Sequence, residues 1–214
     1  NDEARSTYLM FLNYDAAFVK SLEKRPVVLG YYFTSDRDGR VAGTLPAPVM
    51  TKEQLQGRPV RATSWTGYGA NLPEMAKAAA LSGHFNPIVE GDGVVRSLPL
   101  LAEYKGQYYE SIALAMFRVL AGLPSVTPGF SNERYLSRDF QGMDRVLLNQ
   151  GDKSLAIPVD ERVATLVPFR GPGGPAGGSF RYISAADILA HRIPAGSLKN
   201  KIVLVGTTAP GLLD

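Results

Sequence analysis

The sequence predicts an α/β domain with a mixed, largely parallel sheet that is flanked by helices and carries β-hairpin insertions. An amphipathic pattern over Glu3–Lys24 runs directly into an apolar stretch at Val27–Phe33, and a helix followed by a buried strand is typical of α/β folds. A second apolar stretch, Ile202–Val205, ends in a loop of small residues. Four successive apolar positions indicate a strand that is covered on both faces. Between these stretches, short strand-like segments flank glycine-containing turns, which predicts hairpins.

The first part of the chain is expected to contain two helices separated by a surface excursion. Apolar residues recur at helical spacing within Glu3–Lys24, and Arg25-Pro26 ends the pattern. Thr34–Arg61 is rich in glycine, proline and charge, which indicates an irregular surface segment. Asn71 is the expected N-cap of a short second helix, which Gly83 is expected to end.

The middle of the chain predicts a hairpin and a third helix. Glu90–Gly93 has the composition of a turn and precedes a strand expected over Val94–Tyr104. Lys105-Gly106 can reverse that strand into a second one at Gln107–Tyr109. The apolar pattern of Ser111–Ala121 then predicts a helix.

The last third of the chain is expected to begin with an irregular polar stretch and to continue with further strands. The expected segments are the irregular stretch Leu123–Met143, hairpin strands at Arg145–Gln150 and Ser154–Val159, a third strand at Val163–Phe169, a glycine-rich loop at Gly171–Gly178 and a short helix from Ser184 to Ala190.

Composition narrows the classes of function. The 214 residues are 45% hydrophobic and 20% charged, as in ordinary globular domains, and no stretch reaches the roughly 18 consecutive apolar residues of a membrane helix. The net charge is only +3, and no basic block is interleaved with aromatic residues, so no nucleic-acid partner is expected. Cysteine is absent, which excludes disulfides, thiolate metal sites and cysteine nucleophiles.

The motifs of common enzymes are incomplete in this sequence. Gly206–Gly211 has the glycine spacing of a phosphate loop, but Leu212 and Leu213 occupy the positions of its lysine and hydroxyl residue. His84 and His191 are the only histidines, and neither has a second ligand at helical spacing, so no metal is expected. There is also no nucleophile elbow of the G-x-S-x-G type. We therefore expect no catalytic residues and no cofactor.

The best polar candidates for ligand binding are Thr207, Thr208 and Asp214, because they follow the expected buried strand. Gly206 and Gly211 are expected to shape that loop as structural turn residues. Helix caps and turn hydrogen bonds are the default use of these side chains, so ligand binding is the alternative hypothesis.

Two further groups of residues could serve either a site or the fold. Asp92 and Gly93 lie in the predicted turn after Glu90, and the two acids could hold a cation, although a plain structural turn is favoured. Several aromatic residues could line a small-molecule cleft, although packing in the core or at its rim is favoured. These aromatics are Trp65, Tyr68, Tyr104, Tyr108 and Tyr109.

Three stretches of the chain resemble the CHASE2 domain of bacterial membrane receptors. Ala79–Leu101 is similar to the family's "aA-x-x-GF-x-N … D-x-DG-x-x-R-x-x-PL" block, and Tyr108–Gly122 to its "YPSLALALAR-x-x-G" helix. Ser97 stands where a second arginine is usual, and Glu90 replaces the first acid of the turn. The third stretch is the lysine-flanked "KIVLVG" strand with the "TA-x-GL-x-D" turn, matched by Lys201–Gly206, Thr208, Ala209, Gly211, Leu212 and Asp214.

The resemblance implies a sensory rather than a catalytic role. It implies a single extracytoplasmic sensor domain over residues 1–214, periplasmic or extracellular, that belongs to a receptor of the cell membrane. Family domains usually have further strands before the helix that starts near Glu3 and continue beyond Asp214, so the domain is expected to be truncated at both ends.

The resemblance also implies partners. The signal would be an unidentified small molecule or protein, and a homodimer is plausible. The output implied first is an adenylate or guanylate cyclase, and otherwise a histidine kinase, a Ser/Thr kinase or a diguanylate-type enzyme. A stand-alone α/β enzyme with Thr207, Thr208 and Asp214 at its active site is the alternative from another class.

Overall fold

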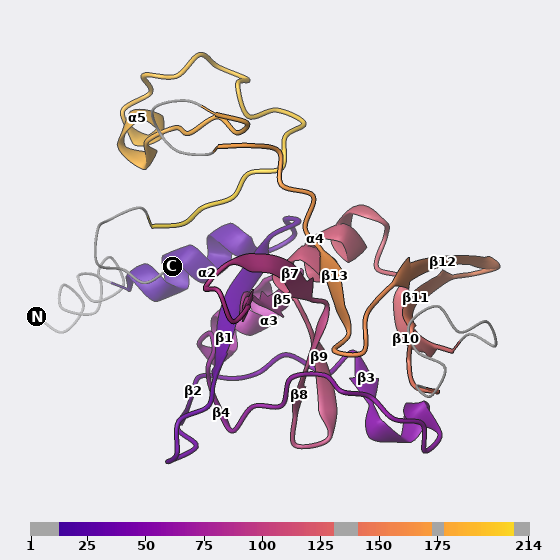
Figure 1. The fold of residues 1–214 in the computed structure, drawn as a ribbon. Helices are drawn as coiled ribbons and strands as arrows, with labels where there is room; N and C mark the ends of the chain where they lie inside the picture. Colours follow the sequence, from indigo (N-terminus) through magenta and orange to yellow (C-terminus); the bar gives the residue numbers. More distant parts are fainter. Residues whose placement is uncertain (1–12, 131–140, 173–177, 208–214) are drawn as a thin grey trace, which may run out of the picture. The chain divides into compact units, whose positions relative to one another are not determined.

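The structure is a computed structural model that describes residues 13–130, 141–172 and 178–207. It divides into two units, Asn1–Val167 and Pro168–Asp214, which are considered separately below. Figure 1 shows the course of the chain. The described elements of the first unit are α2 (Tyr14–Leu22), β1 (Val28–Thr34), β2 (Val41–Ala42), β3 (Met50–Thr51), the 3-10 helix η1 (Lys52–Leu55), β4 (Gly67–Gly69), α3 (Pro73–Ala78), β5 (Leu81–His84), β6 (Ile88–Val89), β7 (Val95–Pro99), β8 (Leu101–Tyr104), β9 (Gln107–Glu110), α4 (Ile112–Leu120), β10 (Ser125–Gly129), β11 (Arg145–Gln150), β12 (Lys153–Pro158) and β13 (Ala164–Leu166).

The sheet built around β1 contains the parallel pairings of the first unit. Its strand order is β2-β4-β1-β5. β1 pairs with β5 in parallel, with Tyr31 opposite His84, and it pairs with β4 in the antiparallel sense. β2 adds to β4 in parallel. Figure 1 shows β1 and β5 close to α3 and α4, the helices that precede β5 and follow β9.

The remaining three sheets are antiparallel, so the prediction of a largely parallel sheet is wrong, while the mixed α/β class and the hairpins are confirmed. These sheets have the orders β3-β9-β8, β13-β7-β6 and β10-β11-β12. Their pairings include tight local reversals at Lys105-Gly106 and Gly151-Asp152. Antiparallel neighbours can be joined by such short turns, whereas a parallel neighbour needs a long crossover.

Two buried clusters form the core of the first unit. The larger one surrounds Leu101, Met143 and Val146, and it includes Leu114 from the inner face of α4. The smaller one is aromatic and is built on Phe33. The two neighbours in β8, Leu101 and Ala102, belong to different clusters, because successive residues of a strand face opposite sides.

Several predicted helices and strands are confirmed within a few residues. Residues 3–12 of the first predicted helix lie outside the described residues. In the described part, Asn13 is the N-cap of α2, and its side chain accepts a hydrogen bond from the Ala16 N–H at 3.0 Å. Ser111 caps α4 in the same way, through the Leu114 N–H at 3.3 Å. β1, β9, β11 and β12 also lie close to their expected positions.

The second predicted helix is shorter than expected, and a strand was missed after it. Asn71 does not cap α3, because its amide donates instead to the Gly30 carbonyl at 3.2 Å. α3 ends at Ala78, and Gly83 lies inside β5 rather than at a helix end. A Cβ on Gly83 would lie 2.5 Å from the backbone of Ile112, so glycine is required there for close packing against α4.

Two other expectations fail because of pairing partners that are distant in sequence. The predicted strand Val94–Tyr104 is divided into β7 and β8 at Leu100, whose N–H donates to the Val163 carbonyl at 2.9 Å. The stretch Leu123–Met143 is not wholly irregular, because β10 pairs with β11. Pro128 and Gly129 are untypical of a strand, so the sequence did not predict β10. β10 is an edge strand of its sheet, where a proline is tolerated.

The second unit contains the last described helix but not the predicted last strand. α5 (Ala185–Leu189) is capped by the Ser184 hydroxyl, as expected, and part of the predicted loop Gly171–Gly178 lies outside the described residues. Ile202–Val205 is neither strand nor helix, and its side chains are between 47% and 92% exposed. The prediction of a buried strand is therefore wrong here. An apolar run forms a strand only where a neighbouring strand accepts its backbone hydrogen bonds.

We expect Gly83→Ala to lower the free energy of unfolding by about 1–3 kcal/mol, because the new methyl group overpacks against the Ile112 backbone. Urea unfolding would measure the loss. Gly91→Ala is the matched control, since a Cβ there meets no atom within 4 Å, and it should stay within about 0.5 kcal/mol of the parent. Equal effects of the two substitutions would contradict the close approach of β5 and α4.

Candidate functional site

The loop predicted to bind ligand is only partly described. Thr207 lies outside any helix or strand and is exposed, while Thr208, Gly211 and Asp214 lie outside the described residues. A Cβ on Gly206 would meet no atom within 4 Å, so no close approach requires glycine there. Because only Thr207 of the three predicted ligand-binding residues is among the described residues, their role stays a prediction.

The turn at Asp92 and Gly93 is present between β6 and β7, and an arginine holds it. Gly93 has a φ of 81°, and the Asp92 carboxylate accepts from the Val94 N–H at 3.1 Å. Arg96 donates to Glu90 at 2.6 Å and to Asp92 at 2.7 Å. These hydrogen bonds from Arg96 lower the pKa of Asp92. The two acids are thus paired with an arginine of their own strand pair, which explains them as turn residues rather than as cation ligands.

The predicted aromatic residues pack in the core. Phe33 lies at the centre of the smaller cluster, with its ring centroid 6.4 Å from that of Trp65, 6.0 Å from Tyr104 and 5.7 Å from Tyr109. Tyr68 meets Tyr104 edge to face at 5.4 Å. Tyr108 belongs to the other cluster, because it faces the opposite side of β9. These contacts favour the packing interpretation over the cleft.

A group of buried polar side chains borders this aromatic cluster and was not predicted as a site. The β1–β5 register sets Tyr31 opposite His84, and Ser82 lies two residues before His84 on the same face of β5. His84 is 0% exposed, and its ring centroid lies 5.8 Å from that of Phe33. Among the described residues, neither ring nitrogen of His84 has a hydrogen-bond partner. Burial lowers the pKa of His84 to about 4, so its imidazole is neutral at pH 7.

An ion pair lies at the end of β9, next to this group. Arg118 of α4 donates to the carboxylate of Glu110, and its Nε donates to the Pro124 carbonyl at 2.9 Å. Burial raises the pKa of Glu110 to about 7, although the charge and hydrogen bond of Arg118 act in the opposite direction. Desolvation therefore outweighs the attraction within this pair. Together, Glu110 and His84 place an acid and a base with oppositely shifted pKa values in one buried region.

Asn86 is a further residue whose structural role was not predicted. Its side-chain amide accepts from the Phe33 N–H at 2.8 Å and donates to the Phe33 carbonyl at 2.9 Å. The Asn86 side chain thus forms with Phe33 the two hydrogen bonds that a neighbouring strand would form, at a position beyond the end of β5. It fixes the part of β1 on which the aromatic cluster is built.

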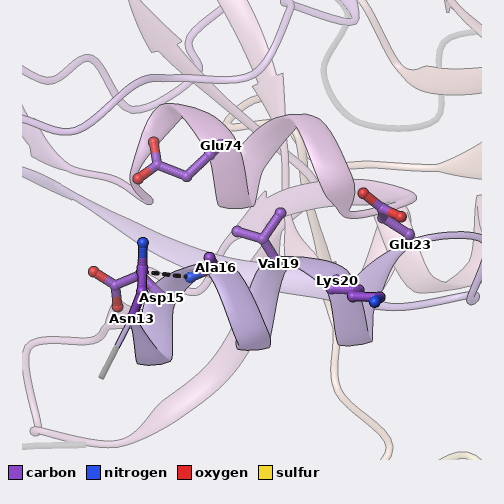
Figure 2. Close-up of a pocket in the computed structure, with 7 residues that line it drawn as sticks. All are labelled: Asn13, Asp15, Ala16, Val19, Lys20, Glu23 and Glu74. Atoms are coloured by element: carbon purple, nitrogen blue, oxygen red, sulfur yellow. Dashed lines mark hydrogen bonds between the residues drawn. The ribbon is translucent and has the colours of Figure 1, made fainter. Parts of the chain in front are cut away.

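A surface depression lies between α2 and α3. Its volume is about 710 Å³, and Figure 2 shows side chains from both helices around it. Most of its polar side chains are charged, and those of Asp15, Lys20 and Glu23 are exposed, so water can solvate them. Its shape and lining specify no ligand. The lining residues are Asn13, Asp15, Ala16, Val19, Lys20, Glu23 and Glu74.

Sequence signals for the buried ion pair were present but weak. Arg118 interrupts an apolar helix pattern, and Glu110 directly precedes the Ser111 cap. Neither feature indicates that the two side chains meet, because they are eight positions apart and lie on different elements. The fold brings them together at the junction of β9 and α4.

The comparisons with known proteins yield one family. A family model described as the CHASE2 domain matches residues 1–214, the whole chain. The comparison with curated proteins finds no match, and the comparison with solved structures finds none.

We expect Asn86→Ala to lower the free energy of unfolding by about 1–3 kcal/mol, because two backbone groups of Phe33 lose their partner. Asn71→Ala removes one bond to the same strand and should cost less. Thermal and urea unfolding of both variants would compare them. A larger loss for Asn71→Ala would contradict the structural role assigned to Asn86.

We expect His84→Phe to resist acid better than the parent chain. The folded pKa of His84 is about 4, below its ordinary value of 6.5, so its contribution to stability is present above 6.5 and is lost as the pH falls through 4. The variant lacks this loss. Its free energy of unfolding, relative to that of the parent, should therefore rise by about 2–3 kcal/mol when the pH is lowered from about 7.5 to about 4.5.

Urea unfolding at the two pH values would measure that gain. The contribution of Glu110 to the pH dependence cancels from the difference, because both proteins contain this residue. His191→Gln, at an exposed position, is the control and should show no comparable gain. A constant difference between parent and His84→Phe at the two pH values would contradict a neutral buried imidazole.

Proposed function

Because the chain belongs to the CHASE2 family, whose members are extracytoplasmic sensor domains of membrane receptors, we propose that it controls a cytoplasmic adenylate or guanylate cyclase. The observation that carries this proposal is the match of the family model to all 214 residues. A sensor domain binds a signal and relays it, so the chain itself is not the catalyst. Among residues 13–130, 141–172 and 178–207, no helix has the length and apolar character of a membrane span.

The residues that carry the family's motifs act in the structure as supports of the fold. Asn86 holds β1, Arg96 holds the turn between β6 and β7, and Ser111 caps α4. These three side chains form hydrogen bonds at separate places in the fold. This arrangement supports a role in which the motif residues maintain the fold rather than carry out a reaction.

The proposed mechanism is a shift between two conformations of the domain. A small molecule or protein that binds one conformation more tightly raises its population by the difference in binding free energy. The receptor's membrane segments then transmit that bias to the output domain, which makes the two sites thermodynamically coupled. The cyclase is the proposed output, and a histidine kinase or a Ser/Thr kinase is the alternative within the same class of receptor.

The output can be tested in membranes from cells that produce the full receptor. We expect these membranes to convert ATP or GTP into the cyclic nucleotide, and membranes from matched cells without the receptor to form none. Transfer of phosphate from labelled ATP to histidine, serine or threonine, without cyclic nucleotide, would instead favour a kinase output.

The isolated chain provides the second arm of this test. Residues 1–214 should hydrolyse none of a panel of generic esters, phosphates and glycosides, because a sensor domain supplies binding and not bond cleavage. Turnover at enzyme-like rates by the purified chain would overturn the sensor assignment and support the stand-alone enzyme.

A further inference from the structure

The Glu110–Arg118 pair joins three elements of the first unit. Glu110 is the last residue of β9, Arg118 lies in the last turn of α4, and Pro124 directly precedes β10. Arg118 contacts both neighbours, through one nitrogen to the Glu110 carboxylate and through Nε to the Pro124 carbonyl at 2.9 Å. The charged side chains are only 12% and 4% exposed, for Arg118 and Glu110 respectively. One guanidinium thus ties the end of α4 to two sheets.

Few ionisable groups surround the Glu110 carboxylate in the described part of the chain. α4 contributes Arg118, and β1 contributes Tyr31, whose pKa is raised by burial first and then by the charges of Tyr109 and Glu110. β5 meets the chain beside Glu110 through the His84–Ser111 bridge, and His84 is neutral at pH 7. β8 places the uncharged Leu101 opposite Glu110. The negative charge is therefore countered locally by a single cation.

The second oxygen of the carboxylate is the available position for a proton. Among the described residues, Glu110 Oε2 is buried and accepts no hydrogen bond, while Oε1 accepts from Arg118. A buried carboxylate oxygen without a partner makes the charged form costly. The pKa of Glu110, raised to about 7 by burial, agrees with this geometry.

We propose that Glu110 and Arg118 form a proton-operated latch, in which protonation of Glu110 releases the last turn of α4 from β9. The proton comes from solvent and binds Oε2, so the carboxylate becomes a neutral carboxylic acid while Arg118 keeps its charge. The attraction that holds the guanidinium in a nearly buried position is then lost. Arg118 turns toward water, and the link from α4 to Pro124 weakens with it.

The latch would open without unfolding the domain. The folded pKa of Glu110 lies above its ordinary value of 4.5, so its contribution to stability is fully present below 4.5 and is lost as the pH rises through about 7. Lowering the pH therefore removes the ion pair, but it increases the contribution of Glu110 to the free energy of unfolding. The latch is a property of the folded domain, and its failure would leave the cyclase proposal untouched.

Hydrogen–deuterium exchange of the 214-residue chain tests the latch. After correction for intrinsic exchange, we expect the amides of residues 117–125, apart from Pro124, which has no N–H, to lose about fivefold in protection between about pH 8 and about pH 6, on either side of the Glu110 pKa. Glu110→Gln should show the low protection at both pH values. Glu103→Gln is the control on the neighbouring strand β8, where Glu103 accepts from the Gly106 N–H at 2.5 Å, and it should keep the pH response.

Equal protection of residues 117–125 at the two pH values in the parent chain would overturn the proposal, and so would an unchanged pH response in Glu110→Gln. If Glu110→Gln does not fold, a carbon-13 titration of the side-chain carboxyls in the parent chain gives the same decision. The latch requires the loss of protection in the parent chain to follow a Glu110 midpoint near 7, and a midpoint at or below 4.5 overturns it.

Discussion

The close approach of β5 to the beginning of α4 is the constraint on which the rest of the first unit depends. Gly83 allows the strand to lie against the Ile112 backbone, and the His84–Ser111 bridge extends this contact. The same approach sets His84 against Phe33 and aligns β5 with β1. Because α4 begins there, the positions of its cap, its buried face and Arg118 all follow from it. A side chain as small as a methyl group at position 83 would disturb each of these relations.

How much of this arrangement the sequence predicts depends on the range of the interactions involved. Local signals sufficed for α4, with its serine cap, and for the hairpin around Gly151-Asp152, because the determining residues lie within a few positions of each other. They failed for β5, where Gly83 indicated a helix end and not a close contact with Ile112. They failed again at Ile202–Val205, since apolar composition does not supply a pairing partner.

The candidate site follows the same division. The turn at Asp92 and Gly93 could be predicted from composition, whereas its neutralisation by Arg96 required the geometry of the β6–β7 hairpin. The buried group around Glu110 and His84 could not be predicted, because the weak sequence signals at Glu110 and Arg118 do not indicate that these side chains meet. Their pKa values are shifted in opposite directions by the same cause, removal from water. Between about pH 4 and about pH 7 these shifts change stability in opposite senses, so the fold depends less on pH than either residue alone implies.

The exposed run Ile202–Val205 has a consequence for the behaviour of the chain at high concentration. Four β-branched or aliphatic residues in succession, outside any sheet, expose apolar surface through which two copies of the chain can associate. Lys199 and Lys201 precede the run, and positive charges next to such a segment act as gatekeepers by repelling an identical neighbour in register. Colloidal stability at this end of the described chain therefore depends on ionic strength, because salt screens the repulsion between lysines of adjacent copies.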